Sequence, residues 1–188
     1  TCALPIYNFV GWYTDESLTK SIEKIATGSY GNKKFYAKWT PIVYNIEYEL
    51  NGGENNSTNP TTYTIESEDI VLQTPSRAGY VFDGWYQDEA LKEKVEKIVT
   101  GSYGNKKFYA KWTPIVYSIK YELNGGENNS QNPATYTIES EDIVLQKPRK
   151  NDYDFVGWYQ TADFSDRIIT TISLGSYGNK TLYAKWES

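Results

Sequence analysis

The stretch that decides the fold is TGSYGNKKFYAKWTPIVY at residues 27–44, because the same 18 letters recur unchanged at residues 100–117. The segment that follows it, 44–74, matches 117–147 with five differences among 31 positions. The same period of 73 residues separates Trp12, Trp85 and Trp158. The chain is therefore built from copies of one unit, and its fold is the fold of that unit.

The repeat divides the chain into two complete units, 41–113 and 114–188, preceded by a partial unit, 7–40, that holds only the C-terminal half. A unit of this length exceeds a solenoid repeat and suits a small independent domain. Residues 1–6, TCALPI, do not follow the repeat, and we expect them to be a non-native leader. The link Thr113-Pro114 is short and stiff, which predicts domains arranged as a semi-rigid string of beads.

Each unit carries strand patterns and one helical pattern. Apolar and polar residues alternate over 42–50, 80–84 and 108–112, which predicts three strands, and a further short strand is expected at 63–65. Leu91, Val95 and Ile98 fall at helical spacing, which predicts a short helix over 90–99. We therefore expect an α+β, mainly β fold for each unit.

Composition excludes several classes of function. The 188 residues include no His, no Met and one Cys, but 18 Tyr, 6 Trp and 6 Phe. Without His, neither a His/Cys zinc site nor a His-based catalytic triad can be built. The net charge of −5 and the absence of a basic block argue against nucleic acid. No cofactor, no metal and no membrane span are expected, and the aromatic residues, which keep the repeat register, are expected to form the cores.

Two clusters allow both a chemical and a structural interpretation. Glu66, Glu68 and Asp69 recur 73 residues later and could be paired carboxylates for glycoside hydrolysis, or a solvated turn with a cap. The polar loops 51–59 and 124–132 hold many oxygen ligands and could bind calcium. Each polar loop has one carboxylate only, so a turn is favoured there over a calcium site. A turn is also favoured for the acidic cluster.

Two pairs of adjacent rings are the candidate binding residues. Trp85 is followed by Tyr86, and Trp158 by Tyr159. Neighbouring side chains on a strand point to opposite faces, so one ring of each pair is expected to face outward. Such a ring could stack on a sugar or contact a partner, or it could be covered by a loop or the next domain.

Three motifs occur together in the second unit: YELNGG at 48–53, Gly84-Trp85-Tyr86, and FYAKW at 108–112. In their order and spacing the units resemble the Listeria–Bacteroides repeat, which is related to the internalin B repeat. The resemblance covers residues 44–112 and 117–186, and the C-terminal half at 7–39. It implies a β-grasp-like fold, tandem arrays and a place in secreted or wall-anchored bacterial proteins, and it implies no catalysis.

Together these features predict a non-enzymatic tandem-repeat segment of a secreted or cell-wall-anchored bacterial surface protein. It would act as a stalk or spacer, with adhesion or protein interaction as a further role. The expected partners are a host or cell-surface protein or a glycan. The alternative is a carbohydrate-binding module that uses exposed Trp and Tyr rings, and an enzyme is the least favoured class.

Overall fold

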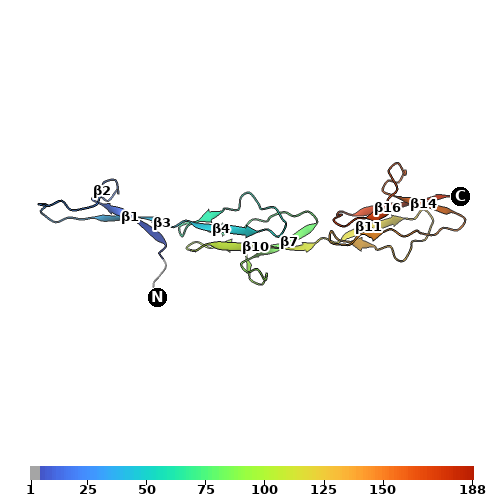
Figure 1. Cartoon of the computed structure of the whole chain (residues 1–188), viewed down its shortest axis with the longest axis horizontal. Coiled ribbons are helices and arrows are strands. Elements are labelled where there is room, and N and C mark those ends of the chain that lie inside the picture. Colours follow the sequence, from blue (N-terminus) through green and yellow to red (C-terminus); the bar gives the residue numbers. More distant parts are fainter. Residues whose placement is uncertain (1–4) are drawn as a thin grey trace. The chain divides into compact units, whose positions relative to one another are not determined.

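The computed structural model describes residues 5–188, and its regular elements in that range are all strands (Figure 1). The predicted leader falls outside the described residues at positions 1–4. The strands are β1 (Tyr7–Tyr13), β2 (Ser21–Ile22), β3 (Tyr36–Pro41), β4 (Tyr44–Glu49), β5 (Thr62–Tyr63), β6 (Ile70–Val71), β7 (Tyr80–Tyr86), β8 (Lys94–Val95), β9 (Lys97–Ile98), β10 (Lys106–Pro114), β11 (Tyr117–Glu122), β12 (Thr135–Tyr136), β13 (Ile143–Val144), β14 (Asp154–Tyr159), β15 (Thr171–Ile172) and β16 (Lys180–Glu187).

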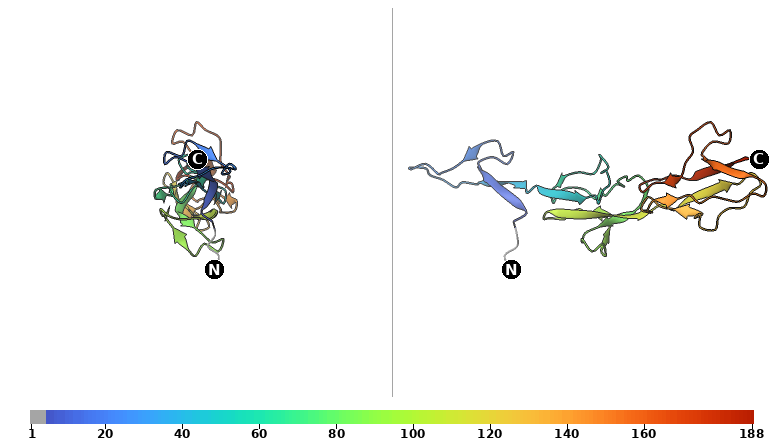
Figure 2. Two further views of the ribbon diagram at one scale, coloured as in Figure 1. Left: turned by 90° about the vertical axis from the view of Figure 1, so that its left-hand side faces the viewer. Right: turned by 45° about the vertical axis from the view of Figure 1, so that its right-hand side comes forward.

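Each complete repeat is organised around its opening and closing strands. In the second unit the sheet order is β5-β4-β10-β7-β8, and in the third it is β12-β11-β16-β14. The opening strand runs parallel to the closing strand, with Tyr48 opposite Phe108 and Tyr121 opposite Leu182. A second, two-stranded sheet completes each repeat, β6-β9 in one and β13-β15 in the other. Figure 2 shows the paired long strands from two other directions.

The alternating patterns predicted these strands correctly. The opening pattern forms β4, in which Ile46 is buried while its neighbours Asn45 and Glu47 are exposed. The closing pattern forms β10, which buries Phe108 and Ala110. A period of two places every second side chain on the core face, and this explains why a simple alternation was sufficient.

The helix predicted over 90–99 is wrong, and with it the α+β class: the described residues contain no helix, so the fold is all-β. Leu91 has a φ of 54°, which ends a right-handed helix where it would begin. The Asp88 carboxylate accepts hydrogen bonds from the backbone N–H groups of Lys92 and Glu93, at 3.0 and 2.6 Å, and closes a loop. The chain then forms β8, with Val95 opposite Trp85. The β-grasp part of the expectation stays a prediction.

Some of the aromatic residues form the cores, as expected, whereas others that keep the repeat register, such as Tyr103 and Tyr177, are exposed. In the third repeat Trp158 is 1% exposed and lies at the centre of a cluster of apolar side chains. Its ring packs edge-on against Tyr121 and Phe155, with centroid distances of 5.3 and 5.4 Å. The second repeat buries the equivalent residues, with Trp85 at 2%. Burying large rings compensates for the small size of each domain.

By contacts, the chain divides into two compact units, and the division does not fall at Thr113-Pro114. One unit runs up to Pro75 and takes in Gly84–Lys111, and the other consists of Ser76–Asp83 and Trp112–Ser188. The division therefore cuts through strands β7 and β10. Each junction between consecutive repeats lies inside one compact unit. The domain boundaries drawn from the repeat stay a prediction.

Candidate functional site

The candidate ring pairs are mostly inside the cores. Trp85 and Trp158 are buried, and each indole N–H donates to a backbone carbonyl, Gln73 O at 3.0 Å and Gln146 O at 3.2 Å. Tyr86 is half-buried. Neither tryptophan is therefore available to stack on a sugar.

Tyr159 departs further from the expectation that one ring of each pair faces outward. It is only 7% exposed, because Phe164 packs edge-on against it at a centroid distance of 5.3 Å. Phe164 occupies the position of Leu18 and Leu91 in the other repeats, with a φ of 57° against 55° and 54°, and it is the only aromatic residue of the three. For Trp158 and Tyr159 the structure therefore shows the alternative stated above, in which a loop covers the second ring.

The partial repeat exposes the ring that the complete repeats bury. Trp12 is 51% exposed and packs against Phe9, at 5.6 Å between ring centroids. Beside Trp12 lies an open groove of about 250 Å³ that Ile22, Ile25 and Phe35 also line. The closing hairpin β1–β3 is present here without an opening strand beside it, which leaves the face open.

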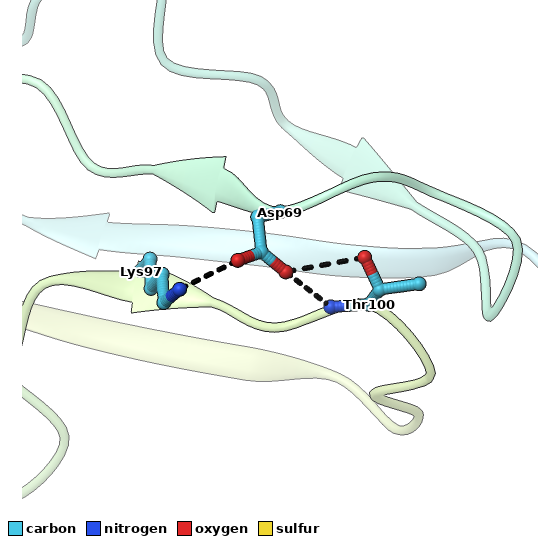
Figure 3. A network of polar contacts seen from close by, with 3 residues as sticks. All are labelled: Asp69, Lys97 and Thr100. Carbon is cyan, nitrogen blue, oxygen red and sulfur yellow. Dashed lines mark hydrogen bonds and ion pairs between the residues drawn. The ribbon is translucent and has the colours of Figure 1, made fainter.

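In the acidic cluster, Asp69 and its equivalent Asp142 make structural hydrogen bonds. Asp69 accepts hydrogen bonds from Lys97 Nζ at 2.6 Å, from the Thr100 backbone N–H at 2.8 Å and from Thr100 Oγ1 at 3.1 Å (Figure 3). The Lys97 bond and then the Thr100 bonds lower the pKa of Asp69 to about 2. Asp142 repeats the backbone contact, accepting from the Leu174 N–H at 2.8 Å. These bonds fix the turn before β6 and β13, which is the structural interpretation of the cluster.

The polar loops are organised by one buried asparagine each. Asn59 accepts from the Gln73 N–H at 2.7 Å, and its amide donates to Gln73 O at 3.0 Å and to Asn55 Oδ1 at 2.8 Å. Asn132 makes the matching three bonds in the third repeat. Within residues 5–188, no group of three or more Asp, Glu, Cys or His side chains could hold a metal ion. The amide networks therefore support the turn interpretation.

A contact between consecutive repeats, which we call the joint, occurs twice. In the first joint the Tyr7 hydroxyl donates to Glu66 Oε1 at 3.1 Å, and in the second Tyr80 donates to Glu139 Oε1 at 2.9 Å. Each has a backbone bond beside it: Ile42 N–H to Ile6 O at 3.0 Å, and Ile115 N–H to Gly79 O at 2.9 Å. Ile6 is the last residue of the predicted leader.

The joints also raise the pKa of the two tyrosine hydroxyls. Loss of water and the bond to Glu139 raise the pKa of Tyr80, although the Arg77 guanidinium, 3.6 Å from its ring centroid, acts against this. The pKa of Tyr7 is raised mainly by its hydrogen bond to Glu66. Sequence reasoning missed the joint. The available signal was that Tyr7, Tyr80, Glu66 and Glu139 all recur at the repeat period.

Across the described part of the chain, no helix is both long and apolar enough to span a membrane.

The chain spans about a fifth to a quarter of the length of the relatives that it matches. It is 34% identical over 183 residues to a protein of Evansella cellulosilytica named as a Gly-rich membrane protein, covering 95% of this chain and 20% of the relative. A second protein of that organism, named as a membrane protein, is 33% identical, covering 96% and 26%.

Internalin H of Listeria monocytogenes is 23% identical over 77% of this chain and 25% of its own length. Among solved structures, streptococcal SHIRT domains 3–4 from a cell surface protein align with 77% of this chain and 96% of their own, at 16% identity. The TM-score of 0.25 is too low for that likeness to bear on the fold. The family model of the Listeria–Bacteroides repeat domain matches residues 6–38, 44–111 and 117–185. The chain belongs to the Listeria–Bacteroides repeat family.

Proposed function

We propose that this chain is a non-enzymatic spacer of a secreted or wall-anchored bacterial surface protein, in which the joints keep consecutive repeats at a fixed separation. The observation that carries the proposal is the joint, built twice from the same residue types. A spacer needs each repeat to hold its neighbour, and a Tyr–Glu bond with a backbone bond beside it provides two contacts at each junction.

The candidate chemical residues support a non-enzymatic role. Glu66 and Glu139 accept bonds from the tyrosines of the preceding repeat, and Asp69 is held by Lys97 and Thr100. A pair of catalytic carboxylates would need to flank one open site on the substrate. Here the carboxylates are instead engaged in turns and joints.

The extracellular location rests on the family and on the relatives. Membership of a repeat family expected in secreted or wall-anchored bacterial proteins supports a surface location. Two relatives are named as membrane proteins, which is consistent with a chain attached to an envelope. The location, the anchor and the proteins or glycans that the whole molecule contacts belong to the proposal.

The predicted ring pairs do not favour the carbohydrate-binding alternative, although other rings, such as Trp12, are exposed. The alternative needs accessible rings, and Trp85, Trp158 and Tyr159 are buried. Tyr86 is half-buried, and a single partly covered tyrosine offers little stacking area.

A distance measurement tests the spacer. Spin labels would be placed at Val71 and Val144, which occupy equivalent, exposed positions on β6 and β13, after Cys2 is replaced by serine. Double electron–electron resonance then gives the distribution of distances between the second and third repeats. We expect one narrow distribution for the chain.

Matched tyrosine variants separate the joint from general stability. Tyr80→Phe removes the hydroxyl that bonds to Glu139, and we expect the distribution to broaden. Tyr153→Phe changes the equivalent residue of the third repeat, which is 45% exposed, and we expect no change. A broad distribution already in the unmodified chain would show freely jointed repeats and reject the spacer.

A further inference from the structure

The second joint contains a close approach that only glycine permits. Gly79 is buried and has a φ of +80°. A Cβ at this position would lie 2.6 Å from Ile138 Cδ1, 3.1 Å from Ile138 Cβ and 3.3 Å from Ile138 Cγ2. The methyl end of Ile138 could rotate away, but its Cβ is placed by the backbone and its χ1 has few allowed values, so the remaining contacts need a shift of a few tenths of an ångström.

The backbone of Ile138 has little freedom to move. Its carbonyl accepts a bond from the Gly175 N–H at 3.1 Å. The turn around it is closed by the Thr137 N–H, which donates to Ser140 Oγ at 2.9 Å, and by the Ser140 N–H, which donates to Thr137 O at 3.1 Å. Relief of a clash would therefore have to come from the joint itself, by moving the two repeats apart.

The third repeat has a different residue at the equivalent position. Asp152 aligns with Gly79 and keeps a left-handed backbone, with a φ of 62°. The turn is therefore the same, since aspartate tolerates this conformation. Asp152 carries the Cβ that the joint excludes, with a carboxylate on it. Two residues later Asp154 stands where the second repeat has Val81.

The incoming side of the joint is acidic. The turn that meets Gly79 and Tyr80 reads Ile138-Glu139-Ser140-Glu141-Asp142. An equivalent turn brought to Tyr153 would meet the carboxylate of Asp152. Like charges brought together with partial loss of water are unfavourable, and this adds to the steric conflict.

We propose that the residue at the Gly79 position determines whether a repeat can accept a following repeat, and that Asp152 makes the far end of the third repeat a non-acceptor. A repeat placed after the third would have to be joined differently. The restriction applies to the left-handed turn, since Ile6, the aligned residue of the first joint, does not have a positive φ.

This inference rests on the proposed spacer function and deepens it. Its test measures the second joint only, and not the distance between repeats. Gly79→Asp is compared with Gly101→Asp, a glycine with a φ of +83° and no neighbour within 4 Å of its Cβ position. Both variants carry the same charge and the same backbone cost. The measurement is NMR hydrogen exchange of the Ile115 amide, which donates to Gly79 O, against core amides of the third repeat.

We expect Gly79→Asp to lower the protection of the Ile115 amide by about tenfold or more while the core amides keep theirs. Gly101→Asp should leave the Ile115 amide unchanged. Unchanged protection in Gly79→Asp would overturn the inference, even if the spin-label distances confirmed a fixed spacer. Equal loss in both variants would also overturn it, because backbone strain would then be the cause.

The reciprocal experiment asks whether the third repeat can be made to form a joint with an added repeat. A second copy of residues 114–188 is fused after Glu187 of the full chain, with and without Asp152→Gly and Asp154→Val. We expect the amide equivalent to Ile115 in the added copy to be protected whenever Asp152→Gly is present, and unprotected with Asp154→Val alone. Equal protection in the unchanged fusion would show that Asp152 accepts a repeat, and the proposal would be wrong.

Discussion

At the scale of single residues, buried polar side chains contribute to the fold beside the aromatic core. Asn59 and Asn132 are buried polar groups, each satisfied by three hydrogen bonds of its own side chain. They join the loop after the opening strand to the segment after β6 and β13. Burial of an amide is favourable only while such bonds are complete.

We expect Asn59→Ala to destabilise the second repeat by about 1–3 kcal/mol, because the Gln73 N–H loses its partner inside the protein, while the Gln73 C=O keeps the bond from the Trp85 indole. The measurement is urea unfolding followed by NMR signals of each repeat. The matched control is Asn32→Ala, an exposed asparagine in the partial repeat, which should change little. Equal effects of the two variants would contradict a structural role for Asn59.

The Asp69 carboxylate makes the stability of the second repeat depend on pH in acid. Its pKa in the folded chain is about 2, below that of an unfolded aspartate, about 3.9. The stabilisation is therefore complete above about pH 4 and is lost as the pH falls toward 2. We expect the urea midpoint of the second repeat to fall over this range, and to fall less in Asp69→Asn. An NMR titration that places the Asp69 pKa near 4 would contradict the contacts with Lys97 and Thr100.

At the scale of elements, the closing hairpin depends on the opening strand for its core. Trp12, Trp85 and Trp158 occupy the same position of the same hairpin. They are 51%, 2% and 1% exposed, and only the last two have β4 or β11 beside the closing strand. The burial of this ring thus reports the presence of the opening half, and the local sequence does not decide it.

This difference predicts unequal costs for the same substitution. Trp158→Ala should destabilise the third repeat by about 3–5 kcal/mol, since it removes a buried ring from the centre of the core. Trp12→Ala should cost about 1 kcal/mol or less, because half of its ring is already in water. Denaturant titration of the tryptophan indole signals measures both. Equal costs would mean that the partial repeat buries its ring in solution.

The sequence predicted the long strands of the second repeat, whereas it did not indicate which strands pair and missed the short strands β6, β8 and β9. Alternation identified β4, β7 and β10 because a core face leaves a period of two in the letters. The pattern Leu91, Val95 and Ile98 fits both a helix and two short strands, and the Asp88 loop, which only the folded chain reveals, decides for strands. Burial of Tyr159 also depended on Phe164, an aromatic residue at a position where the other repeats have leucine.

At the scale of the whole chain, the structure describes fewer strands in residues 7–40 than in each later repeat, and stability should follow. Residues 7–40 have a three-stranded sheet with an exposed aromatic face, whereas each complete repeat has its own core. We expect amides in 7–40 to exchange faster than those in 41–188, because opening a sheet without a core costs less. Hydrogen exchange with mass spectrometry measures this. Equal protection along the chain would contradict the assignment of 7–40 as a partial unit.

The central claim is that each junction is an ordered joint, and orientation gives its most direct test. Residues Ser76–Asp83 belong to the same compact unit as Trp112–Ser188, although they lie in the preceding repeat. In a weakly aligned sample, the N–H residual dipolar couplings of Arg77–Asp83 should therefore fit the alignment tensor obtained from residues 115–188. Couplings for Arg77–Asp83 that are averaged toward zero, or that require a separate tensor, would contradict the joint and the spacer built on it.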